Sequence, residues 1–576
     1  MTKDNVNIAR SPDEYDAIVV GSGIAGGWAA KELTEKGLKT LMLERGRNVE
    51  HIKDYITEHK PDWEFDLRGR LETTVAEKDY FIQTRTGFVD KTVIHFFFKD
   101  SLSRYIEEKP FSWIRGNQVG GKSLTWGRHC YRWSDLDFEA NVRQGIAVDW
   151  PIRYNDIAPW YDYVERFAGI SGEKLGLPHL PDGQFQKPLP LNAVEKELSK
   201  RIHSRYPERY LTIGRVAVLT EPLNGRLPCH FCGPCWRGCS TGSYFSTQSA
   251  TLPPAQATGN LTLQPNSVVH SVIYDETADR ATGVRVIDAE TKEITEYHAR
   301  IIFLCASTLG TTQILLNSRS PRFPEGLGNS SGVLGHFLMD HHFHVGAECE
   351  MPGFEEHYYF GHRPSGFYVP RYRNISPETA RSDFVRGYGI EGGAYRPSWK
   401  RGIAEEGFGA ELKRRLHDPG PWRVDMTCFG ETLPRNNNYV RLDPDQVDSF
   451  GMPLLRFHCD WGENEHAMRK DMAESTAEML EACGGKDVRA YDDEVPGALG
   501  SEPGLGIHEM GTARMGRDPK TSVLNAHNQC HDAANVFVTD GACMTSSANQ
   551  NPSVTYMALT ARAVDYAVEQ LKKRNL

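Results

Sequence analysis

The sequence has no long hydrophobic run. Nowhere in its 576 residues do about 18 consecutive apolar side chains occur, the length at which a segment becomes a candidate transmembrane helix. The first fifteen residues, MTKDNVNIARSPDEY, also lack the apolar stretch of a cleavable secretion signal. We therefore expect neither a transmembrane segment nor an export signal in this chain.

An excess of positive charge is absent as well. The chain has 66 Lys and Arg against 76 Asp and Glu, which gives a formal net charge of −10. Nucleic acids and anionic membrane surfaces attract basic proteins, so neither is an expected partner. The length and the ordinary share of charged residues indicate a soluble enzyme with about two closely joined domains.

Cysteine is sparse and, over most of the chain, unpatterned. Eight of the 12 cysteines are scattered, and a chain of this length builds a large core without disulfides. The other four follow the C-x2-C-x2-C-x3-C spacing with which bacterial ferredoxins hold an iron–sulfur cluster. They are Cys229, Cys232, Cys235 and Cys239, in PCHFCGPCWRGCS. A structural zinc site, which usually takes two separated C-x2-C pairs, and free redox thiols are the less favoured alternatives.

A nucleotide-binding signature lies near the N-terminus, in EYDAIVVGSGIAGGWAAKELTEKGLKTLMLERG. Its parts are an apolar strand at 17–20, Gly21, Gly23 and Gly26, a helix ending at Gly37, a strand at 40–43 and Glu44 at its end. The first Gly permits the tight turn, the second admits a pyrophosphate, and the third lets helix and strand pack closely. The terminal acid binds ribose hydroxyls, so this unit predicts dinucleotide binding.

The rest of the chain shows further strand and helix patterns. Gly120, Gly121 and Ser123 form a second glycine turn that can bring backbone N–H groups against a flavin or phosphate. Residues 149–170 predict an amphipathic helix entered through Pro159. Paired strands follow the Cys loop, then a buried strand and helix at 299–318, then aromatic strands after 331. The C-terminal part returns to a strand ending at Asp540 and a long amphipathic helix.

Two polar residues near the C-terminus are candidates for catalysis. His508 lies in GIHEMGTARMG, and Asn551 precedes Pro552 at the start of the last helix. Oxidising an alcohol requires a base for the hydroxyl proton, which a neutral imidazole provides, and an amide can hold the same oxygen by a hydrogen bond. With 21 His in the chain, neither residue is identified as catalytic by its type alone.

Five segments, in order and over nearly the whole chain, resemble the glucose–methanol–choline (GMC) oxidoreductases, FAD enzymes that oxidise alcohols. They are GSGIAGG with Glu44, VGGKSLTWG, the strand containing Val269, HEMGTARMG, and TDGACMTSSANQNPSVTYMALTARA. Within the family, the C-terminal motifs look most like the pyranose-oxidase and bacterial sugar dehydrogenase branch. The Cys loop is similar to that of the catalytic subunits of glucose, gluconate and glucoside 3-dehydrogenases.

The resemblance implies a role for each matching residue. His508 would be the catalytic base and Asn551 its partner. The implied cofactor contacts are Gly21, Gly23, Gly26, Glu44, Gly120, Gly121, Ser123, Val269, Asp540 and Ala542. Pyranose oxidases tether FAD covalently through a His where this chain has Thr125, so FAD is expected to be bound non-covalently. The cluster would be of the three-iron or four-iron type, and we leave both open.

These features together predict an α/β fold of GMC type. A Rossmann-type FAD-binding domain would span 14–330, with a lid insertion at about 47–112 and the Cys-cluster loop at 229–239. An interleaved substrate domain on an antiparallel sheet would span 331–500, and 501–576 would return to the FAD domain with the catalytic residues. For substrate binding, the stretch 355–400 offers Tyr358, Tyr359, Phe360, Arg371, Tyr388, Glu391 and Trp399.

The predicted function is an FAD-dependent sugar dehydrogenase of the glucoside 3-dehydrogenase type, which passes electrons through the cluster to an external acceptor. Oxidation of an aldose at C1 or of gluconate at C2 is an alternative. A flavin oxidase that uses O₂, with a structural metal knuckle, and a non-catalytic electron-transfer subunit are alternatives of other classes. The implied partners are a small accessory subunit with an export signal and a cytochrome c-type acceptor. Co-export would place the protein in the periplasm; the cytoplasm is the alternative.

Overall fold

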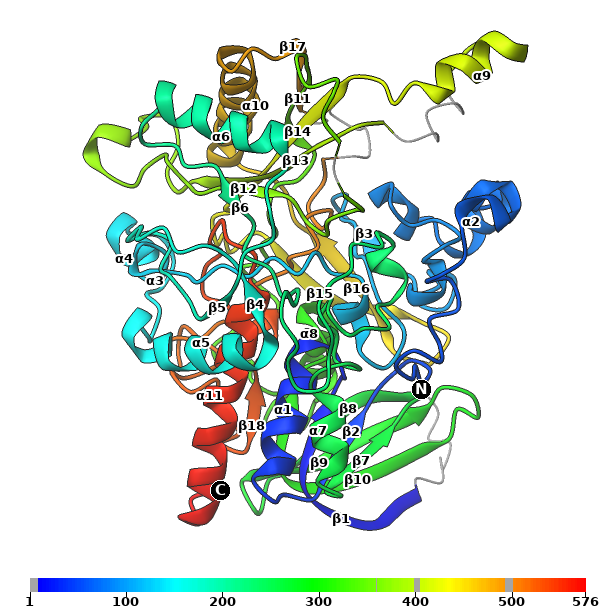
Figure 1. The fold of residues 1–576 in the computed structure, drawn as a ribbon. Coiled ribbons are helices and arrows are strands. Elements are labelled where there is room, and N and C mark those ends of the chain that lie inside the picture. The colour runs from blue at the N-terminus through cyan, green and yellow to red at the C-terminus, as the bar shows by residue number, and fades with distance from the viewer. Residues whose placement is uncertain (1–8, 359, 398–404, 493–500) are drawn as a thin grey trace.

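The computed structural model describes residues 9–358, 360–397, 405–492 and 501–576. Two large sheets dominate it, one at each end of the molecule, with helices packed around both (Figure 1). This mixed α/β architecture confirms the predicted fold class. Within the described residues, no helix combines the length and apolar character needed to cross a membrane.

The first sheet has seven strands and carries the glycine turn. Its order is β7-β2-β1-β10-β9-β8, with β18 pairing to β10. The strands are β1 (Ala9–Val20), β2 (Thr40–Leu43), β7 (Leu261–Gln264), β8 (Ser267–Asp275), β9 (Arg280–Asp288), β10 (Ile294–Leu304) and β18 (Val536–Val538). β1 pairs in parallel with β2 and β10, whereas β8, β9 and β10 pair antiparallel. The ends of β1 and β10 and all of β2 are buried, which explains their continuous apolar sequence.

Helices from distant parts of the sequence cover this sheet. They are α1 (Ile24–Glu35), α5 (Tyr154–Ala168), α7 (Leu252–Ala257), α8 (Thr308–Asn317) and α11 (Ser553–Lys572). α11 packs against both α1 and α5, so the C-terminal helix returns to the N-terminal nucleotide-binding unit (Figure 1). The C-terminal helix therefore lies beside the first glycine turn; the assignment of residues 501–576 to an FAD domain stays a prediction.

The second sheet has six strands and is antiparallel throughout, in the order β17-β11-β14-β13-β12-β6. The strands are β6 (Thr212–Ile213), β11 (Val345–Met351), β12 (Phe367–Val369), β13 (Tyr388–Tyr395), β14 (Trp422–Gly430) and β17 (Lys486–Asp492). Two helices, α6 (Ala193–Arg205) and α10 (Glu463–Ala482), pack against it. Because α6 and β6 lie within 14–330, this unit also draws on residues before 331; the division at 330 and 500 stays a prediction.

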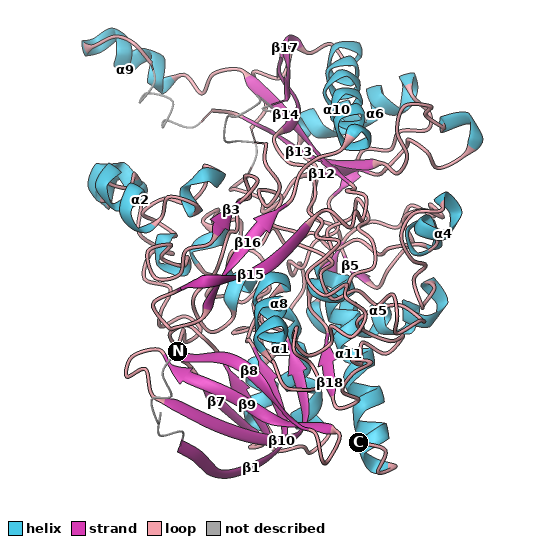
Figure 2. Ribbon diagram, turned by 180° about the vertical axis from the view of Figure 1, so that it is seen from behind, coloured by secondary structure: helices cyan, strands magenta, loops and turns pink. Residues whose placement is uncertain are grey.

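Short elements fill the space between the two sheets. β15 (Tyr439–Val447), β16 (Pro453–His458) and β3 (Ile106–Glu107) form a small sheet (Figure 2). The remaining helices are α2 (Thr73–Asp79), α3 (Asp135–Phe138), α4 (Ala140–Gln144) and α9 (Gly409–His417), and β4 (Ile170–Ser171) pairs with β5 (Phe185–Gln186). The predicted insertion at 47–112 consists mostly of turns and short 3₁₀ segments around α2.

One predicted boundary is wrong. α5 begins at Tyr154 and contains Pro159 inside it, rather than being entered through that proline. Capping decides the start: the carboxylate of Asp135 accepts the Tyr154 N–H at 2.7 Å, and that of Asp156 accepts the Arg153 N–H at 2.8 Å. Caps at the N-terminus thus outweigh the backbone hydrogen bond that a proline removes.

Candidate active site

A cavity of about 890 Å³ links the glycine turn of the first sheet to the strands of the second. Its lining includes Gly21, Gly23, Glu44 and Val269 from the first sheet and its turns. It also includes His508, Asn551, Glu391 and Phe429, of which the last two lie on β13 and β14. The structure therefore brings the predicted nucleotide site and both predicted catalytic residues to one cavity.

The glycine turn between β1 and α1 leaves room for a ligand. Gly21 has a φ of +91°, which favours glycine, and a Cβ at Gly26 would lie 1.9 Å from the Gly21 carbonyl oxygen. A Cβ at Gly23, in contrast, would meet nothing within 4 Å. The turn is thus closed toward the protein at Gly26 and open toward the cavity at Gly23. This is the arrangement that a bound pyrophosphate needs.

Glu44 lies directly after β2 and is buried. Its carboxylate accepts the Ser22 hydroxyl at 2.5 Å and the Gly46 N–H at 2.9 Å. Burial raises the pKa of Glu44. The Ser22 hydroxyl oxygen also accepts the Gly120 N–H at 2.9 Å, which ties the second glycine turn to the first.

Three of the ten predicted cofactor residues do not line the cavity: Gly26, Gly120 and Ala542. Gly26 and Gly120 shape the two turns from behind. Ala542 is fully buried and donates its N–H to the carboxylate of Asp540 at 3.0 Å. Asp540 itself does line the cavity, and burial raises its pKa to about 6.

His508 is held from two sides. Its backbone N–H donates to the carboxylate of Asp340 at 2.8 Å, which also accepts the N–H groups of Gly504 and Gly506. Its ring Nδ1 lies 2.9 Å from Nδ1 of His341. Burial, followed by the positive charge of neighbouring groups, lowers the pKa of His508 well below its ordinary value. The ring is therefore neutral at pH 7 and able to accept a proton.

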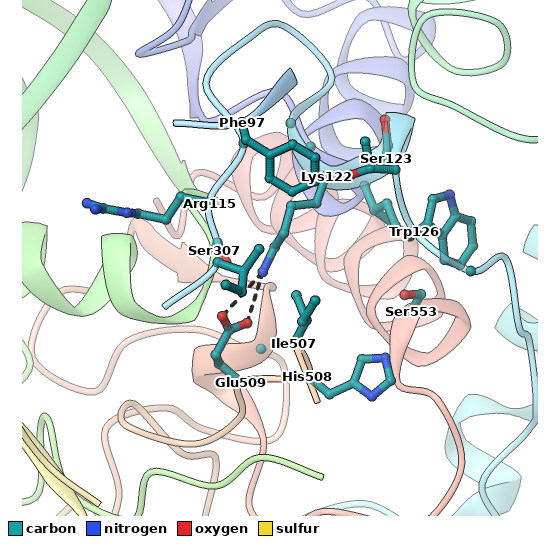
Figure 3. Close-up of a pocket in the computed structure, with 18 of the residues that line it drawn as sticks. Phe97, Arg115, Lys122, Ser123, Trp126, Ser307, Ile507, His508, Glu509 and Ser553 are labelled. Atoms are coloured by element: carbon teal, nitrogen blue, oxygen red, sulfur yellow. Dashed lines mark hydrogen bonds and ion pairs between the residues drawn. The ribbon is translucent and has the colours of Figure 1, made fainter. Parts of the chain in front are cut away.

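An ion pair lies beside His508. Lys122 Nζ is 3.0 Å from Glu509 Oε2, so the second glycine turn is linked to the segment that carries His508 (Figure 3). The same view shows Ser553, at the start of α11, on the side of His508 away from this pair. The second glycine turn and the start of α11 thus lie on different sides of the candidate base.

Glu391 and His129 form a second polar pair in the cavity. Glu391 Oε2 lies 3.2 Å from His129 Nε2, and the His129 Nδ1 lies 2.9 Å from the Tyr131 hydroxyl. Burial raises the pKa of Glu391 to about 8, and the Asn551 amide acts in the opposite direction by hydrogen bonding. Burial lowers the pKa of His129 to about 4. At pH 7 this pair is therefore mainly uncharged, and it faces the candidate catalytic amide.

The predicted sugar-binding stretch is only partly at the site. Glu391 lines the cavity, whereas Tyr388 is buried in the core of the second sheet and Arg371 is in a buried ion pair with Glu431 at 2.7 Å. Tyr358 and Phe360 are exposed on the surface. Tyr359 and Trp399 lie outside the described residues.

Sequence reasoning missed His341, His129, Lys122 and Phe429. A signal for the first existed in the run Asp340-His341-His342, where three polar residues follow an apolar segment. Lys122 and His129 come from one segment, that of the second glycine turn, and Phe429 comes from β14; none of the three has a residue pattern of its own that marks a site.

The four loop cysteines surround a small common pocket of about 20 Å³. All 12 cysteines of the chain lie in the described residues and are free thiols. Two loop sulfurs accept backbone N–H groups, Cys229 from Phe231 at 3.4 Å and Cys239 from Tyr244 at 3.5 Å. Within the described residues, however, no three His, Cys, Asp or Glu side chains are arranged to hold a metal ion. Of the four, Cys235 also lines the large cavity.

Comparison with known proteins identifies relatives over the full chain. The chain is 29% identical to 2-methyl-1,2-propanediol dehydrogenase of Mycolicibacterium austroafricanum, over 97% of this chain and 96% of that protein. It is 24% identical to the fructose dehydrogenase large subunit of Gluconobacter japonicus, over 97% and 98%. Among solved structures, formate oxidase of Aspergillus oryzae covers 98% of this chain and 100% of its own, with 13% identity and a TM-score of 0.62, which shows a shared fold.

Family models describe most of the chain. The N-terminal GMC oxidoreductase model matches residues 15–343, and the C-terminal model matches residues 434–560. These ranges contain both glycine turns, the Cys loop, His508 and Asn551. The chain therefore belongs to the GMC oxidoreductase family, as an FAD-dependent enzyme that oxidises alcohols or sugars.

Proposed function

We propose that this protein is a dehydrogenase for a polyhydroxylated substrate, with the oxidation of a secondary hydroxyl of a pyranoside, as in glucoside 3-dehydrogenases, as its specific reaction. Electrons would leave through an iron–sulfur cluster at the Cys loop to an external acceptor. The observation that carries the proposal is that His508, Asn551, Glu391 and His129 line one cavity together with the glycine turn.

These four polar side chains of the cavity have different roles in the proposed reaction. His508 takes the hydroxyl proton, because burial and nearby positive charge keep its ring unprotonated. Asn551 holds the same oxygen through its amide. Glu391 and His129 supply further hydrogen-bonding groups on the second sheet and its flank, which suits a substrate with several hydroxyls.

FAD supplies the hydride acceptor when it is bound. Gly23 is open to the cavity and Glu44 is buried at the end of β2, which supports the proposal that they contact its pyrophosphate and ribose. Thr125 lines the cavity where a tethering His would stand, which supports non-covalent binding.

A buried cation supports an anionic group at the Cys loop. Arg128 is 1% exposed, and its guanidinium donates to four backbone carbonyl oxygens and stacks on the Tyr244 ring. Among the described residues it forms no ion pair with a carboxylate. Burial lowers its pKa to about 10, while the neighbouring Tyr244, Cys235 and Cys239 act to raise it. A buried charge is costly unless it is paired. The carbonyl oxygens satisfy its N–H groups but leave its charge without a counter-charge; ligating thiolates would add a negative charge nearby, and a cluster there would carry electrons singly.

The surface at this loop suits the exit of electrons to a protein acceptor. Cys232 is exposed, and large apolar side chains are exposed on the loop and on the segment packed beside it. They include Leu227, Trp236 and, from the adjoining insertion, Ile56 and Trp63. Arg237 of the loop pairs with Asp62 of that insertion. We propose a cytochrome c-type acceptor here, together with an accessory subunit that carries the export signal and brings the protein to the periplasm.

A second candidate is oxidation of a small vicinal diol, which the name of the 2-methyl-1,2-propanediol dehydrogenase relative favours. Both candidates use the same residues and differ in the size of the substrate. An O₂-using oxidase and a non-catalytic electron carrier are the alternatives that the experiment must separate from them.

The test is anaerobic turnover with purified holoprotein, using methyl glucoside, glucose, lactose and 1,2-propanediol. The proposal expects flavin bleaching with a glycoside and, by NMR, a keto group on a ring carbon. A lactone product would indicate C1 oxidation instead, and selective bleaching by the diol would favour the second candidate. Stoichiometric peroxide in air would indicate an oxidase, and no bleaching with any substrate would contradict the enzyme function proposed here.

A further inference from the structure

We propose that His341 is a positioning residue, which fixes the proton arrangement of His508 so that the ring nitrogen left for the substrate is the unprotonated one. This inference rests on the proposed role of His508 as the base. His341 lies between β11 and the preceding turn, is fully buried, and does not line the cavity. It can therefore influence the substrate only through the residues that it contacts, one of which is His508.

Two contacts of the His341 ring determine the proton positions. Its Nε2 lies 2.5 Å from the carbonyl oxygen of Ala548. A carbonyl oxygen only accepts hydrogen bonds, so Nε2 must carry a hydrogen. Burial lowers the pKa of His341 to about 4, so the ring holds a single proton at pH 7. Its Nδ1 is consequently an acceptor.

The same reasoning then applies to His508. Its Nδ1 is 2.9 Å from the acceptor Nδ1 of His341, so it must donate. Because the His508 ring is neutral as well, its Nε2 holds a lone pair. The opposite arrangement would place two lone pairs face to face in a buried position, which costs about 1–3 kcal/mol. The carbonyl of Ala548 thus sets the tautomer of the base through His341.

Surrounding groups leave this arrangement undisturbed. The carboxylate of Asp340 is occupied by backbone N–H groups, including that of His508, and burial raises its pKa to about 7. The Phe429 ring lies against both imidazoles, at 6.4 Å from His341 and 6.0 Å from His508 between ring centroids. The titratable groups that also act on His508 are Lys122 and His129.

The test compares His341→Gln with His341→Phe in the holoprotein. A glutamine amide can donate to Ala548 and accept from His508 Nδ1, whereas a phenylalanine ring fills the space without either bond. We expect the rate of anaerobic flavin reduction at saturating substrate to fall at least tenfold in H341F. In H341Q it should stay within about threefold of wild type, with KM little changed in both.

A second readout separates positioning from a structural role. In protein labelled with ¹⁵N-histidine, the His508 ring is identified by its loss in His508→Ala. In wild type and H341Q, the His508 ring should carry its hydrogen at Nδ1. In H341F, both His508 tautomers should be populated. Equal rate losses in H341Q and H341F, or an unchanged His508 tautomer in H341F, would overturn the inference. If His508→Ala instead keeps full activity, the base role fails, which is a different result.

Discussion

Glu391 of the second sheet and His129, which follows the second glycine turn, lie against each other at the cavity, with 3.2 Å between Oε2 and Nε2. Glu391 lies on β13, and His129 comes four residues after the second glycine turn ends at Thr125. His129 is buried and Glu391 is partly buried, and desolvation shifts the pKa of each toward the uncharged form. The pair therefore places a mainly neutral carboxyl group next to the candidate catalytic amide at pH 7.

This relationship predicts a change in rate at alkaline pH. The pKa of Glu391 is raised to about 8, so the carboxyl is neutral below that pH and negative above it. A negative charge in the cavity opposes the loss of the substrate proton, so the rate of flavin reduction should fall as pH rises through about 8. Glu391→Gln carries an uncharged amide at every pH, so the rate of flavin reduction in this variant should not fall near pH 8.

The control for this profile is Asp425→Asn. Asp425 is a partly buried carboxyl on β14 of the same sheet, and desolvation raises its pKa, but it does not line the cavity. It should retain the alkaline fall of the wild type. If Glu391→Gln shows the same fall as well, Glu391 is not the group that titrates.

Removing the candidate base gives a second prediction. His508→Ala should lower kcat by about 10²–10⁴-fold, the usual contribution of general acid–base catalysis. FAD content should remain near the wild-type level, because His508 is not among the predicted cofactor contacts. Stopped-flow flavin reduction measures the rate, and absorbance measures the flavin. A variant with more than about a third of wild-type activity would move the role to another residue.

The sequence predicted the parts of the site that depend on local backbone shape. The turn at Gly21, Gly23 and Gly26 and the acid at the end of β2 form a short motif, and their positions follow from adjacent strand and helix. His341 and His129 were not predicted, because each reaches the site only through tertiary packing. The start of α5 was misjudged for a similar reason: Asp135, from another helix, caps it.

A third prediction concerns how FAD is held. Thr125 stands where pyranose oxidases have the His that bonds covalently to FAD. Acid precipitation should therefore release the flavin into the supernatant, at about one FAD per chain. Absorbance of supernatant and pellet gives the distribution. Flavin that stays with the pellet after washing would contradict non-covalent binding.

The last prediction concerns the Cys loop and separates the two halves of the reaction. Cys235 lines both the small pocket of the loop and the large cavity, so Cys235→Ser removes the thiol that faces each. Hydroxyl deprotonation depends on His508, and anaerobic bleaching of the flavin by substrate should therefore proceed at a near wild-type rate. Reduction of a cytochrome c acceptor should fall at least about tenfold, equivalent to about 1.4 kcal/mol on that step.

Cys530→Ser is the matched control, because Cys530 is a buried thiol remote from the loop sequence and should change neither half-reaction. Wild-type protein should contain about three to four irons per chain, as clusters of this ligand spacing do. A wild-type protein with one zinc and no iron would show that the loop is structural. A serine variant that reduces the acceptor as fast as wild type would show that electrons leave by another route, even if iron is present.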